Sequence, residues 1–502
     1  MASILGSEAL TPRVVTAALG GLALTTTIWS YIRAWYRLRH VPGPALASVS
    51  YYWILLTTTL SGKQAANLDA INRKYGPLAR IGPNDVLTND PEVVRRINGA
   101  RSTYVRSDWY RSLKMDPYHD SLSSILDTKE HDKLKAKLSF GYGGKENPGI
   151  ETGVDEQLVA LTRLIRDKYL SSSTLRPMDF AIKIQYFTLD ALTQVAYGKA
   201  FGFLEADADL HDYIASTAGL LPPLHAGADV PWLGDILLWP PLLSMMGPKA
   251  TDEKGYGKMI AAASRVVAER FGEDAKDRFD MLGSFVRHGV PQRDCEAEVQ
   301  FQIIAGSDTT ATALRGTLLS LITTPTAYFA LQREIDAAVA AGQLSSPIAT
   351  AEEGKQLPYL QAVIYEGLRM HIPFSGLAMK QGDTIAGHFL PGGVRVAVNF
   401  LGVQRSKEVF GEDVDIFRPE RWLGLGAEQT VAWRNHVELV FGSGRWGCSG
   451  RNLAFMELNK VYIQLLRNFD FTLINPRKPM TSSNFGIFVE KDMWVRVTER
   501  NV

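Results

Sequence analysis

The spacing of apolar and polar residues predicts a mainly helical protein. Apolar residues recur at three- and four-residue intervals, as on the buried face of a helix, in the segments 153–170, 250–271, 324–341 and 357–370. Short runs typical of strands occur at 76–88 and 384–400, and again in DFTLINP and MWVRVTE near the end of the chain. Helical and strand patterns do not alternate regularly, which argues against a doubly wound parallel sheet. We expect a mainly α fold with small β-sheets.

The N-terminal region has a different pattern. Residues 14–32 carry no charge, and a helix of this length spans about 28 Å, close to the thickness of a membrane's hydrocarbon core. More basic residues follow this segment than precede it, and the positive-inside rule then places its C-terminal side in the cytosol. A cleaved signal peptide is the alternative, but such a peptide normally carries its positive charge before the apolar run. We expect a transmembrane anchor.

These patterns predict four parts along the chain: a short lumenal N-terminus (1–13), the transmembrane anchor (14–32), a basic and Pro/Gly-rich linker (33–48) and a single cytosolic domain (49–502). One segment of the domain, 220–248, is too rich in proline for one helix and too apolar for an ordinary loop. Three interpretations stay open for it: a second surface that dips into the membrane, a lid over an apolar cavity, or a buried irregular segment.

Composition narrows the function. The chain has 54 Lys and Arg against 53 Asp and Glu, so its net charge of +1 gives no basic field for nucleic acid. Its two cysteines, Cys295 and Cys448, are too few for a disulfide framework or an all-cysteine zinc site. Any metal chemistry must therefore rely on a prosthetic group. Cys295 is expected to be an inert helical cysteine, because nothing electropositive lies near it in the sequence.

The most informative stretch is ELVFGSGRWGCSGRNLAFMELNK, residues 438–460, read as a strand-like run, a glycine-rich loop and a helix. Its Gly442, Gly444 and Gly447 fit the G-x-G-x-x-G pattern of a dinucleotide-binding loop. Only 55 residues follow Gly447, however, which leaves little room for the βαβ unit that such a loop requires. Cys448 is better placed, since a helix start favours a thiolate, and a thiolate there can be an axial ligand of haem iron.

Four motifs in order give the chain its resemblance to a known family. They are AGSDTT (305–310), the Glu366 and Arg369 pair in YEGLR, FRPERW (417–422), and FGSGRWGCSG with Phe441, Gly444, Cys448 and Gly450. In these motifs the chain resembles the haem-thiolate monooxygenases of the cytochrome P-450 superfamily. The N-terminal anchor and Pro-Gly segment resemble the microsomal branch, and GRWGCSGRNLAFMELNK is similar to fungal members.

The resemblance implies haem b, held between the long oxygen-binding helix and the helix of the cysteine loop, with Cys448 as the axial ligand of the iron. The other residues that it implies at the cofactor are His131, Lys135, Lys380, Arg445, Trp446, Phe441, Gly442, Gly450, Ala305 and Gly306. Trp446 stands where the family usually has a basic residue that binds a haem propionate, so a variant propionate site is expected. Asp308 and Thr309 match the acid–alcohol pair that delivers protons to bound oxygen. Glu366, Arg369 and Arg421 would form a structural ion-pair network behind the cysteine loop.

By the same resemblance, the protein is a monooxygenase of the endoplasmic reticulum membrane that inserts one atom of O₂ into a lipophilic small molecule, in fungal secondary-metabolite biosynthesis. Its electrons would come from NADPH through a separate NADPH–cytochrome P-450 reductase, with cytochrome b5 as a further candidate partner. The alternatives are a haem-thiolate isomerase, dehydratase or peroxide-using enzyme that needs no external electrons, and a non-catalytic haem protein. The implied substrate pocket draws on 103–125, 205–245, Ile303–Thr309, Pro373–Met379 and Phe485–Phe488.

Overall fold

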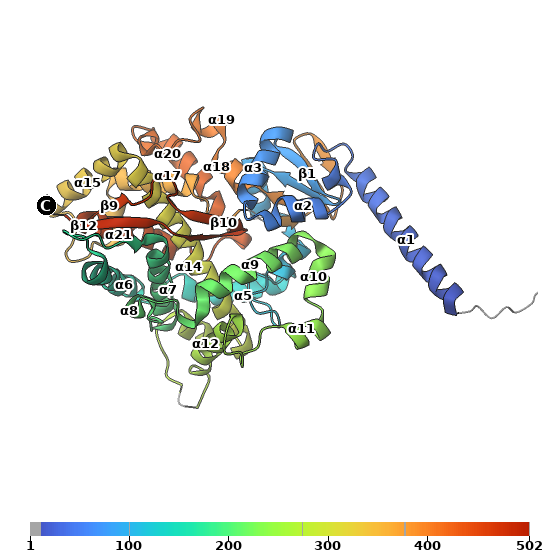
Figure 1. Cartoon of the computed structure of the whole chain (residues 1–502), viewed down its shortest axis with the longest axis horizontal. Coiled ribbons are helices and arrows are strands. Elements are labelled where there is room, and N and C mark those ends of the chain that lie inside the picture. The colour runs from blue at the N-terminus through green and yellow to red at the C-terminus, as the bar shows by residue number, and fades with distance from the viewer. Residues whose placement is uncertain (1–11, 100, 274, 376–377, 501–502) are drawn as a thin grey trace, which may run out of the picture.

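The computed structural model describes residues 12–99, 101–273, 275–375 and 378–500. The predicted fold class is confirmed: helices dominate, and the strands form small sheets at the edges of the helical body (Figure 1). The helices are α1 (Pro12–Arg37), α2 (Tyr52–Thr57), α3 (Gln64–Tyr75), α4 (Pro91–Asn98), α5 (Thr128–Tyr142), α6 (Ile150–Leu164), α7 (Phe180–Tyr197), α8 (Phe203–Ala206), α9 (Tyr213–Asp229), α10 (Pro231–Leu237), α11 (Pro240–Met246), α12 (Tyr256–Ala268), α13 (Met281–Arg287), α14 (Gln292–Thr323), α15 (Pro325–Ala340), α16 (Ala351–Lys355), α17 (Pro358–Met370), α18 (Phe400–Gln404), α19 (Lys407–Phe410), α20 (Ala427–Val437) and α21 (Arg451–Asn468).

The described strands form four sheets. The largest has the order β1-β2-β8-β5-β3 and contains β1 (Leu78–Gly82), β2 (Asp85–Thr88), β8 (Arg395–Val398), β5 (Ala378–Lys380) and β3 (Val105–Arg106). Its only parallel pair is β2 with β8, within the described strands. The others are the three-stranded sheet β4 (Met178–Asp179), β12 (Trp494–Glu499) and β9 (Phe469–Leu473), the hairpin β10 (Thr481–Phe485) and β11 (Ile487–Lys491), and the hairpin β6 (Asp383–Ile385) and β7 (His388–Leu390).

The long helix α14 runs through the body and packs against α7, α12, α17 and α21 (Figure 1). Because helices surround α14, most of its side chains are buried. Polar side chains such as those of Asp308 and Arg315 are buried as well. Cys295 lies near its start, fully buried, and burial raises the pKa of its thiol to about 12. A thiol with that pKa is unreactive at neutral pH.

A buried arginine ties the N-terminal helix to the body. Arg80 of β1 is buried. Its guanidinium donates, at 2.7–3.1 Å, to the backbone carbonyls of Ala34, Trp35, Ser48, Gly82 and Pro83. Two of these carbonyls belong to the last turns of α1, where a helix has unpaired carbonyls and where a cation is favourable. Helix α1 thus continues to Arg37, past the predicted end of the anchor, and Leu38 and Val41 beyond it are buried. Residues 1–11 of the predicted lumenal segment lie outside the described residues.

The segment 220–248 folds into three helical pieces. Pro222 and Pro223 lie inside α9, whereas Pro231 and Pro240 occupy the first positions of α10 and α11, where a missing N–H costs nothing. The C-terminal end of α9, from His225 to Asp229, is buried, but α11 has no buried residue. The segment is therefore neither irregular nor buried as a whole, and the interpretation as a buried irregular segment is wrong.

Behind the cysteine loop, one buried carboxylate organises two arginines. Oε1 of Glu366 accepts from Arg369 (2.8 Å), Arg421 (3.0 Å) and the backbone N–H of Arg418 (2.9 Å), while Oε2 accepts from Arg369 and from Trp422 Nε1 (3.0 Å). Both Glu366 and Arg369 are completely buried. Burial alone would raise the pKa of Glu366, but its bonds and charge interactions with the arginines outweigh burial and lower it.

The arginines extend this network to the chain that supports the loop. Arg369 donates to the carbonyl of Val414 (2.6 Å), and Arg421 donates to the carbonyl of Phe410 (3.0 Å) and to Asp413 (2.9 Å). The result is that α17 is fixed to the segment that precedes the cysteine loop.

We predict that Glu366→Gln destabilises the protein by about 3–5 kcal/mol, because it leaves the buried guanidinium of Arg369 without a carboxylate and that of Arg421 with Asp413 alone. Since the pKa of Glu366 is lowered on folding, the stability that its ionised form contributes is present at neutral pH and is lost as the pH falls through the pKa of the folded state. Denaturant unfolding of the wild type and the variant at several pH values measures both effects.

The matched control is Glu352→Gln, which removes an exposed carboxylate from an i, i+3 pair with Lys355. No measurable change is expected there. Equal stability of wild type and Glu366→Gln would contradict the structural role of the network.

Candidate functional site

The cysteine loop is built from two turns of 3₁₀ helix joined by glycines. The run Glu438–Phe441, which the sequence pattern suggested to be strand-like, is 3₁₀ helix, and a second such turn covers Gly444–Trp446. Gly442 joins them with φ +64°, and a Cβ there would lie 2.9 Å from the carbonyl oxygen of Trp446. Only glycine therefore permits this close return of the chain.

The sulfur of Cys448 lies at the end of the loop. The Cys448 N–H donates to the carbonyl of Phe441 at 2.6 Å, and α21 begins three residues later at Arg451. The Cys448 side chain is exposed, yet protein surrounds it closely enough that burial raises the pKa of its thiol. The N–H groups of Gly450 and Arg451 and the charge of Lys135 act in the opposite direction and favour the thiolate. The sulfur thus lies within the molecule on a surface that no other side chain covers.

Two of the cations predicted at the haem edge, Lys135 and Arg445, bind groups of the protein. The ammonium of Lys135 donates to three carbonyls of the loop, those of Gly444 (3.3 Å), Arg445 (2.7 Å) and Gly447 (2.8 Å). The guanidinium of Arg445 binds Asp132 on α5 (2.9 Å). Both residues hold the loop against α5, and their predicted role at the haem propionates stays a prediction.

Trp446 lies in a small cationic cluster that the sequence analysis did not recognise. Its Nε1–H is buried and has no partner among the described residues. The His131 ring lies 4.7 Å from the indole, and the Arg106 guanidinium lies 4.9 Å over it. Burial and the charge of Arg106 lower the pKa of His131 to about 4, so its imidazole is neutral at physiological pH. A neutral, aromatic edge thus lies beside a half-buried arginine.

Arg106 is the residue that sequence reasoning missed. Its Nη1 donates to the carbonyls of Leu122 and Ile125, but its Nε is buried without a partner, and no ion pair joins it to a carboxylate within the described residues. Buried cations normally have an anionic partner. The sequence offered only a basic residue in an aromatic-rich stretch, TYVRSDWY, with no pattern to link it to Trp446 some 340 positions later.

Lys380 lies on the strand beside this cluster. Its backbone in β5 pairs with Val105 of β3, next to Arg106. The predicted role of its side chain at a propionate stays a prediction.

One face of α14 is less buried than the rest of this core helix. It carries Phe301, Ala305 and Thr309 at four-residue spacing, and the Thr309 hydroxyl donates to the carbonyl of Ala305 at 2.8 Å. Gly306 faces elsewhere: a Cβ on it would lie 2.9 Å from both methyl groups of Leu192 on α7. The missing side chain of Gly306 thus lets α14 pack closely against α7.

Asp308 is buried beside Thr309 and turned toward α7 and α9. Its carboxylate accepts from Gln185 on α7 and from the hydroxyl of Tyr213 on α9 at 2.9 Å. Burial raises the pKa of Asp308 to about 6, although Tyr213 and the charge of Arg315 lower it in part. An acid with this pKa accepts and releases protons near neutral pH. No hydrogen bond joins its carboxylate to the Thr309 hydroxyl within the described residues.

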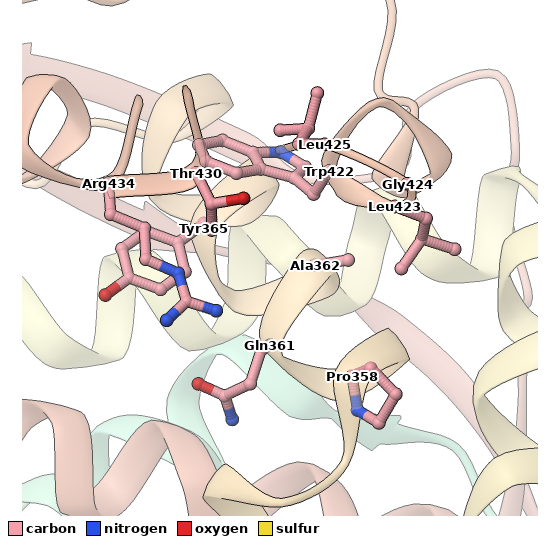
Figure 2. Close-up of a pocket in the computed structure, with 10 residues that line it drawn as sticks. All are labelled: Pro358, Gln361, Ala362, Tyr365, Trp422, Leu423, Gly424, Leu425, Thr430 and Arg434. Carbon is pink, nitrogen blue, oxygen red and sulfur yellow. The ribbon is translucent and has the colours of Figure 1, made fainter. Parts of the chain in front are cut away.

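A surface hollow of about 170 Å³ lies beside the Glu366 network and away from the sulfur. Figure 2 shows Arg434 and Tyr365 together on one side of it, with Pro358 and Leu423 on the other. Trp422, which also lines it, donates to Glu366. The hollow is part of the supporting segment and carries none of the predicted cofactor residues.

These donors fit haem. A sulfur at a helix N-terminus suits an axial iron ligand, and the unpartnered Trp446 Nε1–H and Arg106 Nε–H suit the carboxylates of two propionates. Among the described residues, no group of three or more His, Cys, Asp or Glu side chains is arranged to hold a metal ion directly.

Comparison with known proteins agrees with this assignment. The model of the family "Cytochrome P450" matches residues 42–493. The chain is 48% identical to "Cytochrome P450 monooxygenase ABA1" of Pyricularia oryzae, over 97% of this chain and 98% of that protein. It is 43% identical to "Cytochrome P450 monooxygenase aba1" of Botryotinia fuckeliana, over 92% of both, and 39% identical to "Cytochrome P450 monooxygenase abl1" of Leptosphaeria maculans, over 92% of this chain and 83% of that protein. With its cysteine loop, its long central helix and this extent of similarity, the chain belongs to the cytochrome P450 family of haem-dependent monooxygenases.

Proposed function

We propose that this monooxygenase receives electrons from NADPH through a separate reductase and oxidises a lipophilic small molecule in fungal secondary metabolism. The observation that carries the proposal is Asp308, a buried acid with a raised pKa that is next in the chain to Thr309 on the less buried face of α14. Haem with a thiolate ligand supplies the activation of O₂, and this activation requires protons. An acid with a pKa of about 6 beside a hydroxyl suits repeated proton delivery. An isomerase, dehydratase or peroxide-using enzyme has less need of such a pair.

The side chains proposed to hold the haem have separate tasks. Cys448 binds the iron, and Arg106 and Trp446 bind propionate oxygens beside His131. Phe441, Gly442 and Gly450 shape the loop under the ring, while Ala305 and Thr309 form the opposite wall. Lys135 and Arg445 keep the loop in place through its carbonyls and through Asp132.

Membrane attachment is supported by one apolar helix near the N-terminus. Among the described residues, the helix spanning Val14–Arg37 is long and apolar enough to cross a bilayer by length and composition, and none of it is buried. We propose that it anchors the protein in the endoplasmic reticulum membrane with the catalytic domain in the cytosol. Exposed Trp232, Trp239, Met245 and Met246 on and between α10 and α11 suit a second contact with the lipid surface. Figure 1 shows α11 on the side of the body toward which α1 projects.

The proposed substrate regions come together around Trp109. Its ring lies 5.8 Å from His225 and 6.3 Å from Phe374, and Phe374 forms a β-bridge with Ile487. Residues 376–377 of the predicted Pro373–Met379 region lie outside the described residues. Aromatic and aliphatic side chains dominate this junction, which supports a lipophilic substrate.

The electron supply is tested by mixing the purified protein with NADPH under carbon monoxide, with and without a fungal P450 reductase. The reduced carbonmonoxy spectrum should develop only when reductase is present. In air, the reductase-supported oxidation of NADPH should then slow on the order of 10²-fold in Asp308→Asn, because the amide cannot release a proton. The wild-type rate should also change with pH near 6, whereas that of Asp308→Asn should not.

The control is Glu298→Gln, which changes another buried carboxyl group of α14 that binds Tyr142 and the backbone of Leu122. It should oxidise NADPH at close to the wild-type rate. Failure of reductase to support reduction, together with turnover driven by peroxide alone, would favour the alternative class.

The assignment of Arg106 predicts that Arg106→Gln loses haem faster, about 10- to 100-fold, because a charged hydrogen-bond donor to a propionate is removed. The rate of haem transfer to apomyoglobin measures this. Arg111→Gln, an exposed arginine of the same segment that pairs with Asp235, is the control and should match the wild type. Unchanged haem retention in Arg106→Gln would exclude Arg106 from the propionate site.

A further inference from the structure

Helix α9 carries a buried stripe with a polar group at each end. Tyr213, Thr217, Leu221 and His225 follow one another at four-residue spacing, so they share one face, and all four are buried. Tyr213 reaches Asp308 of α14 at 2.9 Å. His225 lies at the other end, roughly 18 Å further along the helix axis. The stripe therefore extends from the proposed proton-delivery pair to the junction around Trp109.

His225 is placed where separate parts of the chain converge. Its ring meets the edge of Trp109, with centroids 5.8 Å apart and planes at 73°. It also covers Gly486 in the turn between β10 and β11, where a Cβ would lie 1.9 Å from its Cε1. Trp109 in turn contacts Phe374. Three of the proposed substrate regions, 103–125, 205–245 and 485–488, thus meet directly at this imidazole.

The imidazole has an unmet hydrogen-bonding capacity. His225 is 2% exposed, and its Nδ1 is buried with no partner among the described residues. Burial lowers the pKa of His225 to about 3, so the ring is neutral and offers one N–H donor and one acceptor. A buried polar atom without a partner is costly, and an aromatic or aliphatic residue would fill the same position at no such cost. This orphaned nitrogen points to a ligand.

We propose that His225 binds a hydrogen-bonding oxygen, a hydroxyl, carbonyl or carboxylate, at the end of an elongated lipophilic substrate remote from the carbon that is oxidised. The proposal rests on the proposed monooxygenase function and specifies its substrate class. The apolar body of the substrate would extend from His225 toward Thr309, on the less buried face of α14. His225 would then determine which end of the substrate is presented for oxidation, as a specificity-determining residue and not a catalytic one.

The test uses imidazoles that bind the haem iron through one nitrogen and carry a tail toward α9. Three series of equal chain lengths are compared by difference-spectrum titration of the full-length protein: N-alkylimidazoles, the matching ω-hydroxyalkyl imidazoles and the matching ω-carboxyalkyl imidazoles. In the wild type, an oxygen-ended tail of suitable length should bind about three- to tenfold more tightly than the alkyl tail. Preference for the hydroxyl or for the carboxylate identifies which oxygen group the site takes.

His225→Phe should abolish this preference and bind the alkyl series at least as tightly as the wild type does. His225→Asn, which keeps a donor and an acceptor close to the position of Nδ1, should retain part of it, and it also serves if the phenylalanine variant does not fold. Ala215→Ser, at an exposed position of α9, is the control and should behave as wild type.

The proposal is overturned if no chain length in the wild type favours an oxygen-ended tail, if the preference survives in His225→Phe, or if tailed imidazoles give no spectral change at all. The titration needs neither NADPH nor reductase, and the carbonmonoxy spectrum of each variant reports separately on its haem and thiolate. A failure of the electron-supply proposal is therefore distinguishable from a failure of this one.

Discussion

The requirement to hold one sulfur atom inside the protein, at the start of α21, organises the elements around it. The Cys448 N–H is bonded to Phe441, Gly442 allows the chain to fold back on Trp446, and Lys135 fastens three loop carbonyls to α5. Behind the loop, the Glu366 network fixes the preceding segment to α17. Loops in proteins are usually mobile, but here several backbone groups near the sulfur are hydrogen-bonded, three of them to a side chain of α5.

Charge is distributed unequally about this sulfur. Two cations, Lys135 and Arg445, bind carbonyls and Asp132, whereas the half-buried Arg106 has carbonyl partners for one nitrogen only and no bonded carboxylate within the described residues. On the other side, Asp308 is a buried acid of α14, and burial raises its pKa. A guanidinium with an unbonded N–H suits an anionic cofactor edge, and an acid with a raised pKa suits proton transfer, so the two halves of the site differ in the way that the proposed chemistry requires.

Sequence patterns predicted the helices that carry the site and the cysteine loop, because periodicity and short motifs are local properties. The four predicted helices correspond to α6, α12, α15 and α17, and the strand-like runs correspond to β1, β2, β6–β9 and β12. Contacts between segments that are distant in the chain could not be predicted from the sequence. Arg106 approaches Trp446 only through tertiary packing, and the partners of Asp308, Gln185 and Tyr213, come from two other helices. Lys135 was predicted from its helical spacing with His131, but this spacing does not reveal which groups the side chain contacts. In the structure its ammonium binds carbonyls of the cysteine loop.

The central claim is that Cys448 binds haem iron as a thiolate. The most direct measurement is the absorption spectrum of the purified protein, reduced and under carbon monoxide, compared with that of Cys448→Ala. The account predicts a strongly red-shifted Soret band in the wild type that is lost in the variant. Well-folded wild-type protein with no haem band, or the same band in both proteins, would contradict it.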